Sequence, residues 1–263
     1  MNNSTKMTKP QRGIQSIEVG GQLLRSLAAS PGPMALRDLA RESGMDASKA
    51  HRYLVSFGKL GLVAQDADGG AYGLGPLAAQ LGIAALRRFD PLREATAAAA
   101  ALVTQIGHTV AIAVHGPLGP TVVRIEESDH ALHVNMRVGT VMSLLNTATG
   151  LVFAAWLPTA ETNRMLRDEA IRLYGERPRR SIDATTEQTL REVRKHGLAR
   201  AVGKPIPGIN AVSAPIFDLD GRLVLALTAL GPSGTFDAAW GGPLAKSVVA
   251  AATSVSRNLG APA

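Results

Sequence analysis

Residues 36–54, LRDLARESGMDASKAHRYL, constrain most strongly what this chain can fold into. Apolar residues recur at helical spacing on both sides of Gly44, a natural left-handed helix stop, and Asp46 is a suitable N-cap for the second segment. The pattern predicts two short helices, at residues 36–43 and 47–60, joined by a tight turn. Such a pair is typical of a helix-turn-helix, whose second helix lies in the DNA major groove.

The flanking segments predict a winged form of this motif. Residues 16–29 have a helical apolar stripe, although Gly20 and the glycine after it disfavour helix, so we expect a frayed start. Residues 62–74 predict two short strands around Asp68-Gly69-Gly70, a hairpin signal. Three helices followed by a β-hairpin indicate a winged helix-turn-helix over residues 14–75.

Five polar residues of this region are candidate DNA contacts. Ser48, Lys49 and Arg52 lie on one side of the second helix. There the hydroxyl can bond a base edge or a phosphate, and the two cations can donate to phosphates or guanine. Arg37, at the start of the preceding helix, is placed for the phosphate backbone. His51 can be either a base contact or a packing residue. The expected wing has two aspartates and no Lys or Arg, so we expect it to bind phosphate weakly.

The rest of the chain predicts an α+β domain that follows a linker helix. Pro76 opens a helical stretch, residues 76–90, which we interpret as the linker, and an Ala-rich helix is expected at residues 92–106. Strands that bracket a block of helices favour an antiparallel or mixed sheet. The expected strands are residues 109–115, 120–127, 131–137, 210–218 and 222–230, and the expected helices are residues 147–157, 161–174, 185–196 and 239–259.

The composition excludes several classes of protein. Of 263 residues, 46% are hydrophobic and 19% charged, which excludes a disordered chain, although residues 1–13 are expected to form a flexible tail. There is no cysteine, so disulfides and thiolate metal sites are excluded. The net charge of +7 favours polyanionic partners only weakly. No signal peptide or membrane-spanning run is visible, so we expect a cytoplasmic protein with no membrane partner.

The sequence contains no convincing catalytic set. Asp129, His130 and His133 form a D-H-x-x-H pattern, but the two histidines would face opposite sides of a strand, so we expect no metal. G-x-S-x-G is absent, and the glycine-rich turns lack the Lys-Ser/Thr ending of a phosphate loop. We therefore predict no enzyme and no cofactor. The alternatives are an enzyme that converts a small molecule and a protein-interaction module, each with a winged-helix appendage.

A series of short motifs follows in order along the chain. They are LRDLARESGMDASKAHRYL, LGLV, YGLGP, QIGHTVAIAV, RVG, TATG, FAAWLP and GINAVSAPIFDLDGRLVLALTALGP. Over residues 14–258 this ordered set resembles the IclR family of bacterial transcriptional regulators.

The resemblance implies a DNA-binding transcriptional regulator whose C-terminal domain senses a small molecule. This effector-binding domain, residues 91–260, would be α/β and GAF/PAS-like with an antiparallel sheet. A homodimer or a dimer of dimers would bind double-stranded DNA at a palindromic operator, because one recognition helix reads only a half-site. Whether the protein represses or activates stays open. Leu77, Leu81, Gly82 and Ile83 of the linker helix would suit a dimer seam, or would pack on their own subunit.

The resemblance also implies an effector pocket between a helix N-terminus and two late strands. Free N–H groups at a helix N-terminus suit a carboxylate, although TATG can instead be a simple cap with a close-packed glycine. Family members commonly carry an acidic residue where Ala201 stands and a cysteine where Ala211 stands. The pocket is therefore expected to be apolar and to bind an organic acid, such as an aromatic carboxylate. Thr228 or Asn210 would orient this effector, and Lys204 would add charge. The predicted effector-binding residues are Asn146, Ala148, Thr149, Gly150, Ala201, Ala211, Ser213, Thr228 and Leu230.

Overall fold

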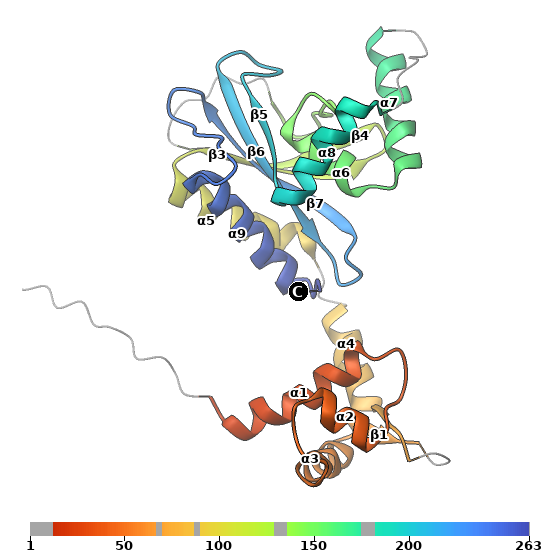
Figure 1. The fold of residues 1–263 in the computed structure, drawn as a ribbon. Helices are drawn as coiled ribbons and strands as arrows, with labels where there is room; N and C mark the ends of the chain where they lie inside the picture. Colours follow the sequence, from red (N-terminus) through yellow and green to blue (C-terminus); the bar gives the residue numbers. More distant parts are fainter. Residues whose placement is uncertain (1–12, 67–69, 87–89, 129–135, 175–181, 263) are drawn as a thin grey trace, which may run out of the picture. The chain divides into compact units, whose positions relative to one another are not determined.

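The chain divides into two compact units, Met1–Phe89 and Asp90–Ala263, which are described separately (Figure 1). Among the described residues, no helix combines the length and apolarity needed to cross a membrane. The expected tail lies almost wholly outside the described residues, as does most of the strand expected at 131–137. The computed structural model describes residues 13–66, 70–86, 90–128, 136–174 and 182–262.

The N-terminal unit is a winged helix-turn-helix, as predicted. Strands β1 and β2 pair antiparallel to form the wing, and Leu23, Leu39 and Leu54 from the first three helices are almost fully buried in one core. Its elements are α1 (Gln15–Ala29), α2 (Leu36–Glu42), α3 (Ala47–Leu60), β1 (Val63–Gln65), β2 (Tyr72–Leu74) and α4 (Pro76–Leu86).

Close packing of α1 on α3 explains why Gly20 lies inside a helix although glycine disfavours helix. In the structure α1 is helical from Gln15. Gly20 is buried, and a Cβ there would lie 2.9 Å from Cδ1 of Tyr53 and 3.0 Å from Cζ of Phe57. The missing side chain therefore lets the two helices approach each other, which offsets the low helix propensity of glycine.

The ends of α3 follow from two local interactions. The Asp46 side chain accepts a hydrogen bond from the backbone N–H of Lys49 at 2.8 Å, which satisfies a donor that the first turn leaves free. At the other end Gly61 has φ +76°, the left-handed conformation that ends helices. These signals are local in sequence, which is why the expected range, 47–60, is the range of α3.

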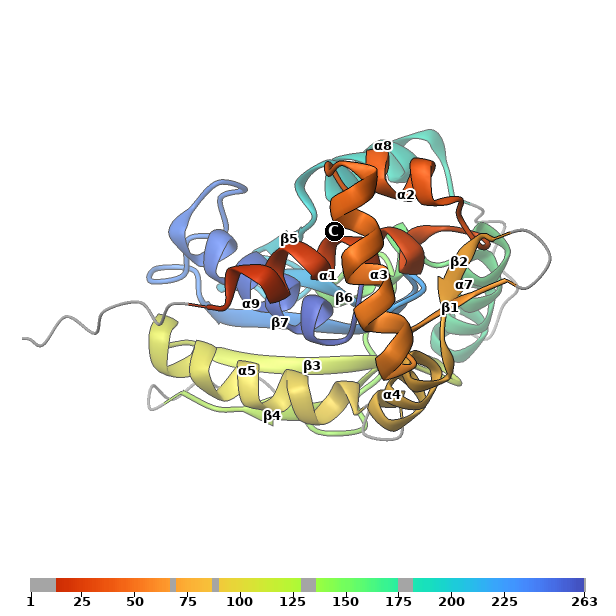
Figure 2. The ribbon, with the colours of Figure 1, turned by 90° about the horizontal axis from the view of Figure 1, so that it is seen from below.

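The C-terminal unit has an antiparallel sheet covered on both faces, and this confirms the predicted α+β class. The described strands pair in the order β4-β3-β7-β6-β5. Helices α5 and α9 lie side by side on one face, and α6 with α8 covers the other (Figures 1 and 2). The elements are α5 (Pro91–Ile106), β3 (Thr109–Gly116), β4 (Gly119–Glu126), α6 (Ala148–Trp156), α7 (Thr159–Tyr174), α8 (Ala184–His196), β5 (Ala199–Val202), β6 (Ile209–Phe217), β7 (Leu223–Pro232) and α9 (Pro243–Asn258).

The register of the late strands places alternate residues on the face that α6 covers. Ala211 pairs with Leu230 and Ser213 with Thr228 across β6 and β7, and Ala201 of β5 pairs with Ala211. Because side chains alternate along a strand, these residues share one face. The sequence did not predict β5, a four-residue edge strand too short to show a period.

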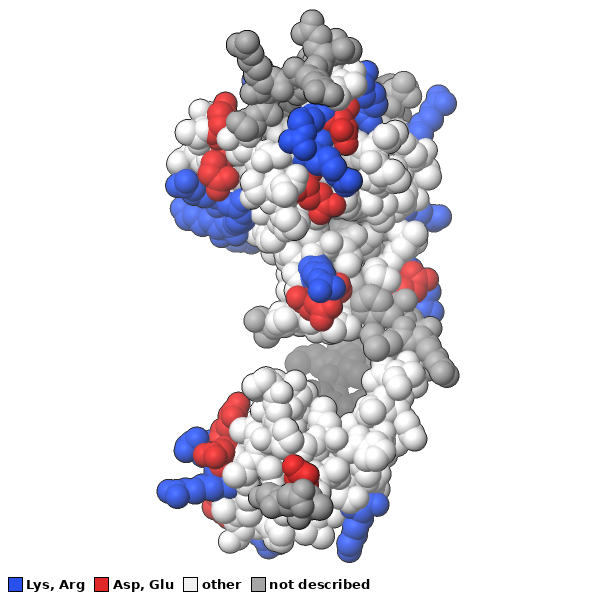
Figure 3. Space-filling model, turned by 90° about the vertical axis from the view of Figure 1, so that its right-hand side faces the viewer, with Lys and Arg blue, Asp and Glu red and all other residues white. Residues whose placement is uncertain are grey.

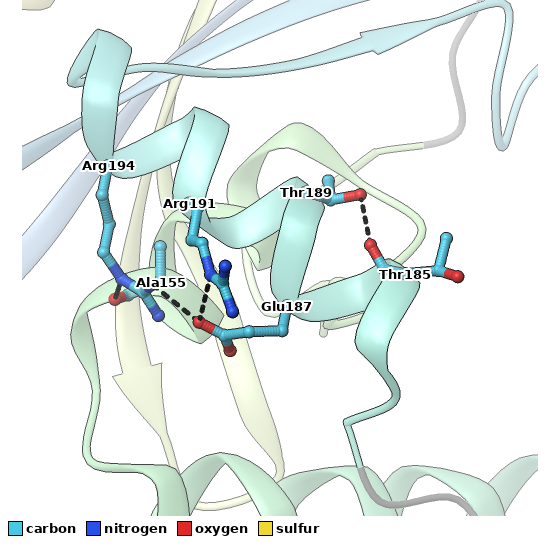
Figure 4. Close-up of polar contacts among 6 residues, drawn as sticks. All are labelled: Ala155, Thr185, Glu187, Thr189, Arg191 and Arg194. Atoms are coloured by element: carbon cyan, nitrogen blue, oxygen red, sulfur yellow. Dashed lines mark hydrogen bonds and ion pairs between the residues drawn. The ribbon is translucent and has the colours of Figure 1, made fainter.

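Helix α8 fixes the C-terminal end of α6 through a guanidinium group (Figure 4). Nε of Arg194 donates to the backbone oxygen of Ala155 at 2.8 Å, and its Nη1 donates to Oε1 of Glu187 at 3.1 Å. Arg191 approaches the same carboxylate oxygen at 3.7 Å. A cation at the last turn satisfies a free carbonyl of α6 and complements its dipole. Helix α6 is thereby anchored at its C-terminal end, which leaves its N-terminus free of this contact.

Candidate functional site

Helix α3 presents a polar surface outside the core of the N-terminal unit. Ser48, His51 and Arg52 are exposed and Lys49 is half-buried, whereas Ala50, one residue from His51, is fully buried. His51 is therefore not a core residue. Its Nδ1 lies 3.5 Å from the hydroxyl of Tyr72 on β2, so the helix and the wing meet at this ring.

The charges around this helix are mixed in sign. Arg37 is exposed in the first turn of α2, and Arg41 of the same helix pairs with Asp38 at 2.8 Å. In the wing, Asp66 is exposed and donates its backbone N–H to the oxygen of Ala71, while residues 67–69 lie outside the described part. Figure 3 shows, on the face it presents, Lys and Arg side chains interspersed with Asp and Glu. Binding of a polyanion around α3 would therefore depend on individually placed cations.

The C-terminal unit contains a cavity of about 130 Å³ between the sheet and the N-terminus of α6. Cavities of about 150 Å³ can hold one benzene ring, so this space is large enough for a small organic molecule. The lining residues are Met136, Thr140, Met142, Thr147, Ala148, Thr149, Ala201, Lys204, Pro205, Ile206, Ile209, Ala211, Thr228 and Leu230.

The cavity brings together part of the residue set expected from the sequence. The residues of that set that line it are Ala148, Thr149, Ala201, Ala211, Thr228 and Leu230.

Three other residues of the set do not reach the cavity wall. Asn146 is exposed and its side-chain amide donates to the Ser143 hydroxyl at 2.9 Å. Gly150 is buried, and a Cβ there would lie 2.5 Å from the backbone oxygen of Leu144. Ser213 is 0% exposed and lies behind Thr228, to which its hydroxyl is hydrogen-bonded. These three residues are therefore not among those that line the cavity.

The N-terminus of α6 supplies polar groups to the wall. The hydroxyl of Thr147 accepts the N–H of Gly150 at 2.9 Å, which leaves the N–H groups of Ala148 and Thr149 without a partner inside the helix. Among the hydroxyls, Oγ1 of Thr149 and Oγ1 of Thr228 are 2.8 Å apart. Backbone donors and hydroxyls thus converge on one end of an otherwise apolar space.

Residues in two irregular segments line the cavity but were not predicted from the sequence. Met136, Thr140 and Met142 belong to a segment held beside β4, where Val122 donates its N–H to Thr140 at 2.9 Å. Pro205, Ile206 and Ile209 come from the connection between β5 and β6 and its end. Met136 falls in the strand expected at residues 131–137. The other five residues lie outside every expected element, and the apolar character of most of them was the one available signal.

Two further polar residues proposed for the pocket have different positions. Among the described lining residues, Lys204 is the one ionisable side chain, and it is exposed at the rim. Asn210 does not line the cavity. Its side-chain oxygen accepts from Gly203 N–H at 3.1 Å and its amide donates to the Phe236 oxygen at 2.9 Å, so both groups already serve the fold.

The arrangement suits recognition of a small molecule better than chemistry on it. Among the described residues, the lining side chains other than the hydroxyls and Lys204 are apolar, and none is a carboxylate or an imidazole. In the described part of the chain, no group of His, Cys, Asp and Glu could hold a metal ion. The sequence motif with His130 and His133 lies outside the described residues.

Comparisons with known proteins cover almost the whole chain. Residues 16–67 match the model of the IclR helix-turn-helix domain, and residues 83–257 match that of the bacterial transcriptional regulator IclR C-terminal domain. The glycerol operon regulatory protein of Streptomyces coelicolor is 30% identical, covering 95% of this chain and 98% of the relative. The transcriptional repressor IclR of Escherichia coli is 25% identical over 86% of this chain and 83% of its own.

Solved structures show the same relationship. The crystal structure of Pseudomonas aeruginosa HmgR is similar with a TM-score of 0.78 and 39% identity, covering 94% of this chain and 99% of that one.

Proposed function

This chain belongs to the IclR family of bacterial transcriptional regulators, and we propose that it binds a palindromic operator under the control of an organic acid. It is a DNA-binding regulator with an N-terminal helix-turn-helix and a C-terminal effector-binding domain. Because its partner is DNA, we place the protein in the cytoplasm. We further propose that its C-terminal domain binds its ligand without converting it. The cavity of about 130 Å³ at the N-terminus of α6 is the observation that carries the effector proposal.

The proposed DNA contacts are the exposed polar residues around the turn. Lys49 and Arg52 donate to phosphates or guanine, and Ser48 bonds a base edge or a phosphate. Arg37 contacts the backbone from α2. His51 is the fifth candidate, because its ring is exposed and its position relative to the wing is set by Tyr72.

We propose that α4 contributes to the dimer that a palindrome requires. Leu81 is 55% exposed and Ile83 is 53% exposed. Between them lies Gly82, where an added Cβ would point into open space. Leu77 instead lies against the end of α3, where its N–H donates to the Gly61 oxygen at 2.8 Å. An exposed apolar pair on a short helix favours burial against a second subunit.

The effector is an organic acid with an apolar body, for example an aromatic carboxylate. Met142, Ile206 and Leu230 contact the body, and the free N–H groups at the start of α6 bind the acid group. Lys204 adds positive charge at the rim. The effector acts by binding two states of the dimer with different affinities, which changes the spacing of the recognition helices.

Two measurements on the full-length protein test this function. A genomic footprint identifies the operator, and mobility shifts on that DNA should weaken steeply with salt, because several phosphates are contacted. Salt-insensitive binding would favour the protein-interaction alternative. A thermal-shift screen of organic acids tests the effector class, which is wrong if only two-carbon acids or cations stabilise the protein. Turnover of any stabilising compound would favour the enzyme alternative.

A further inference from the structure

Three hydroxyl groups form a chain behind and along the cavity wall. Oγ1 of Thr228 lies 2.8 Å from Oγ1 of Thr149 and 2.8 Å from Oγ of Ser213. Thr149 is 3% exposed, Thr228 5% and Ser213 0%. The chain links α6, β7 and β6, and we name Thr149, Thr228 and Ser213 the hydroxyl triad.

The number of protons in the hydroxyl triad determines what it can offer a ligand. Each hydroxyl has one proton to donate and two lone pairs to accept with. Two hydrogen bonds connect the three groups and use two of the three protons, so one proton is left. Among the described residues the Ser213 hydroxyl has no other partner, and Ser213 has no contact with the cavity.

The buried position of Ser213 decides where the remaining proton points. If Ser213 kept its proton unused, a donor would be buried without an acceptor, which is costly. Ser213 therefore donates to Thr228. The remaining proton then belongs to Thr149 or Thr228, and both line the cavity.

We propose that the hydroxyl triad always presents one hydroxyl proton to the cavity, so that the effector must place a hydrogen-bond acceptor oxygen there. A carboxylate, carbonyl or phenolic oxygen meets this requirement, whereas an ammonium group, which only donates, does not. Ser213 is a positioning residue that acts through Thr228. This inference rests on the proposed function of the cavity as the effector site.

The count of hydroxyl protons also predicts that either Thr149 or Thr228 can supply the proton that faces the cavity. In Thr149→Val, Ser213 still donates to Thr228 and the Thr228 proton points to the cavity. In Thr228→Val, Thr149 keeps its proton, but the Ser213 hydroxyl loses its acceptor. A wall in which each hydroxyl made its own separate ligand contact would lose affinity with each substitution.

A stability cycle without ligand tests the hydrogen bond from Ser213. The Tm is measured for the wild-type protein, Ser213→Ala, Thr228→Val and the double variant. We expect Thr228→Val to lower the Tm and the added Ser213→Ala to restore part of the loss, because it removes the orphaned hydroxyl. A double variant with a Tm no higher than that of Thr228→Val would overturn the assignment of Ser213.

Ligand binding tests the acceptor requirement, with phenylacetate as the probe and calorimetry as the measurement. We expect Thr149→Val to stay within about threefold of the wild-type Kd, because Thr228 supplies the proton. Replacing the whole triad, Thr149→Val with Thr228→Val and Ser213→Ala, should weaken binding about tenfold or more, as expected for a lost bond to a charged oxygen. Thr162→Val is the matched control: Thr162 is fully buried on α7, outside the cavity, and the Kd should not change.

The outcomes separate this inference from the proposed function. If the wild-type protein binds phenylacetate and the triad variant binds equally well, the acceptor requirement is wrong while the effector cavity stands. If phenethylammonium binds as tightly as phenylacetate, the requirement is also wrong. If the wild-type protein binds no aromatic acid, both the effector class and the acceptor requirement are wrong. The stability cycle then still tests the hydrogen bond between Ser213 and Thr228.

Discussion

The proposed DNA contacts and the cavity wall are assembled from the chain in different ways. Four of the five proposed contacts lie within residues 48–52, on a single helix whose ends are set by Asp46 and Gly61. The cavity wall combines α6, three strands and two irregular segments that are far apart in sequence. Contacts local in sequence form within one helix, whereas the wall exists only after the sheet and α6 have packed. A substitution that disturbs packing should therefore affect the cavity more than the recognition helix.

The largest expected effect is at Gly150, because backbone atoms surround it. In Gly150→Ala, the Cβ would lie 2.5 Å from the Leu144 oxygen and 2.6 Å from its Cα, and backbone cannot move aside cheaply. We expect the C-terminal unit to lose about 3 kcal/mol of stability. Both tryptophans, Trp156 and Trp240, belong to this unit, so urea unfolding followed by tryptophan fluorescence reports on it.

A matched glycine controls for the substitution itself. Gly234 has nothing within 4 Å of an added Cβ, so Gly234→Ala should change stability by less than about 0.5 kcal/mol. Equal effects at the two glycines would contradict the close packing of α6 on the loop before it.

The next largest effect is expected on the helix surface, where affinity changes without a loss of stability. Arg52→Ala should weaken binding to the operator about five- to hundredfold and should weaken binding to random duplex less, because a base contact is lost. Lys49→Ala should weaken both similarly and lower the salt slope by about one. Mobility shifts at several salt concentrations measure these changes.

Arg222 on the β6–β7 turn provides the control for loss of a cation. It pairs with Asp220 at 3.2 Å and lies outside the recognition helix, so Arg222→Ala should leave DNA binding unchanged. Unaltered binding in both Arg52→Ala and Lys49→Ala would remove α3 as the recognition helix.

A smaller effect should follow from loss of a helix cap, and two caps allow a comparison between the units. Asp46 caps α3 through Lys49, and Asp90 caps α5 through Arg93 at 3.0 Å. Replacing either by Ala should cost about 1 kcal/mol in its own unit. Only Asp46→Ala should weaken operator binding, because only α3 carries the proposed contacts.

Charge and capping at Asp46 can be separated. Asp46→Asn keeps a good cap but removes the negative charge, so hydrogen exchange at the first turn of α3 should stay slow while DNA affinity rises or is unchanged. Fast exchange in the Asn variant would contradict the role of residue 46 as a helix cap. Weaker operator binding in Asp90→Ala would contradict the expectation that only the cap of α3 affects DNA binding.

The contrast between local and distant contacts also explains how much the sequence could predict. The turn signals around α3 act over three or four residues, so its bounds follow from the sequence alone. The resemblance named Ala211 and Ser213 together, and alternation along β6 puts both on one face, but alternation carries no information on depth. Ser213 lies behind Thr228, and only the packed structure shows this.

The residues missed in the cavity have a related physical cause. Met142 and Ile206 lie outside the expected helices and strands, and their place in the wall depends on hydrogen bonds to β4 and on the connection after β5. Gly150 fits the alternative that the sequence left open for TATG, a close-packed glycine, because backbone atoms surround it. Chemical class was easier to predict than position: an apolar wall follows from Ala201, Ala211 and Leu230 wherever their neighbours lie.

The smallest effect should come from substitution of Lys204. The size of this effect shows whether the acid group of the ligand binds at the start of α6 or at the rim beside Lys204. Lys204 is exposed at the rim, where water and salt screen its charge, so Lys204→Ala should weaken phenylacetate binding only about two- to fivefold. The difference should shrink as salt rises. Lys246→Ala on α9 is the control, since this exposed lysine does not line the cavity. A loss of about a hundredfold would instead place the carboxylate at Lys204 and leave the start of α6 and the hydroxyl triad to the apolar body, which would reverse the proposed orientation of the effector.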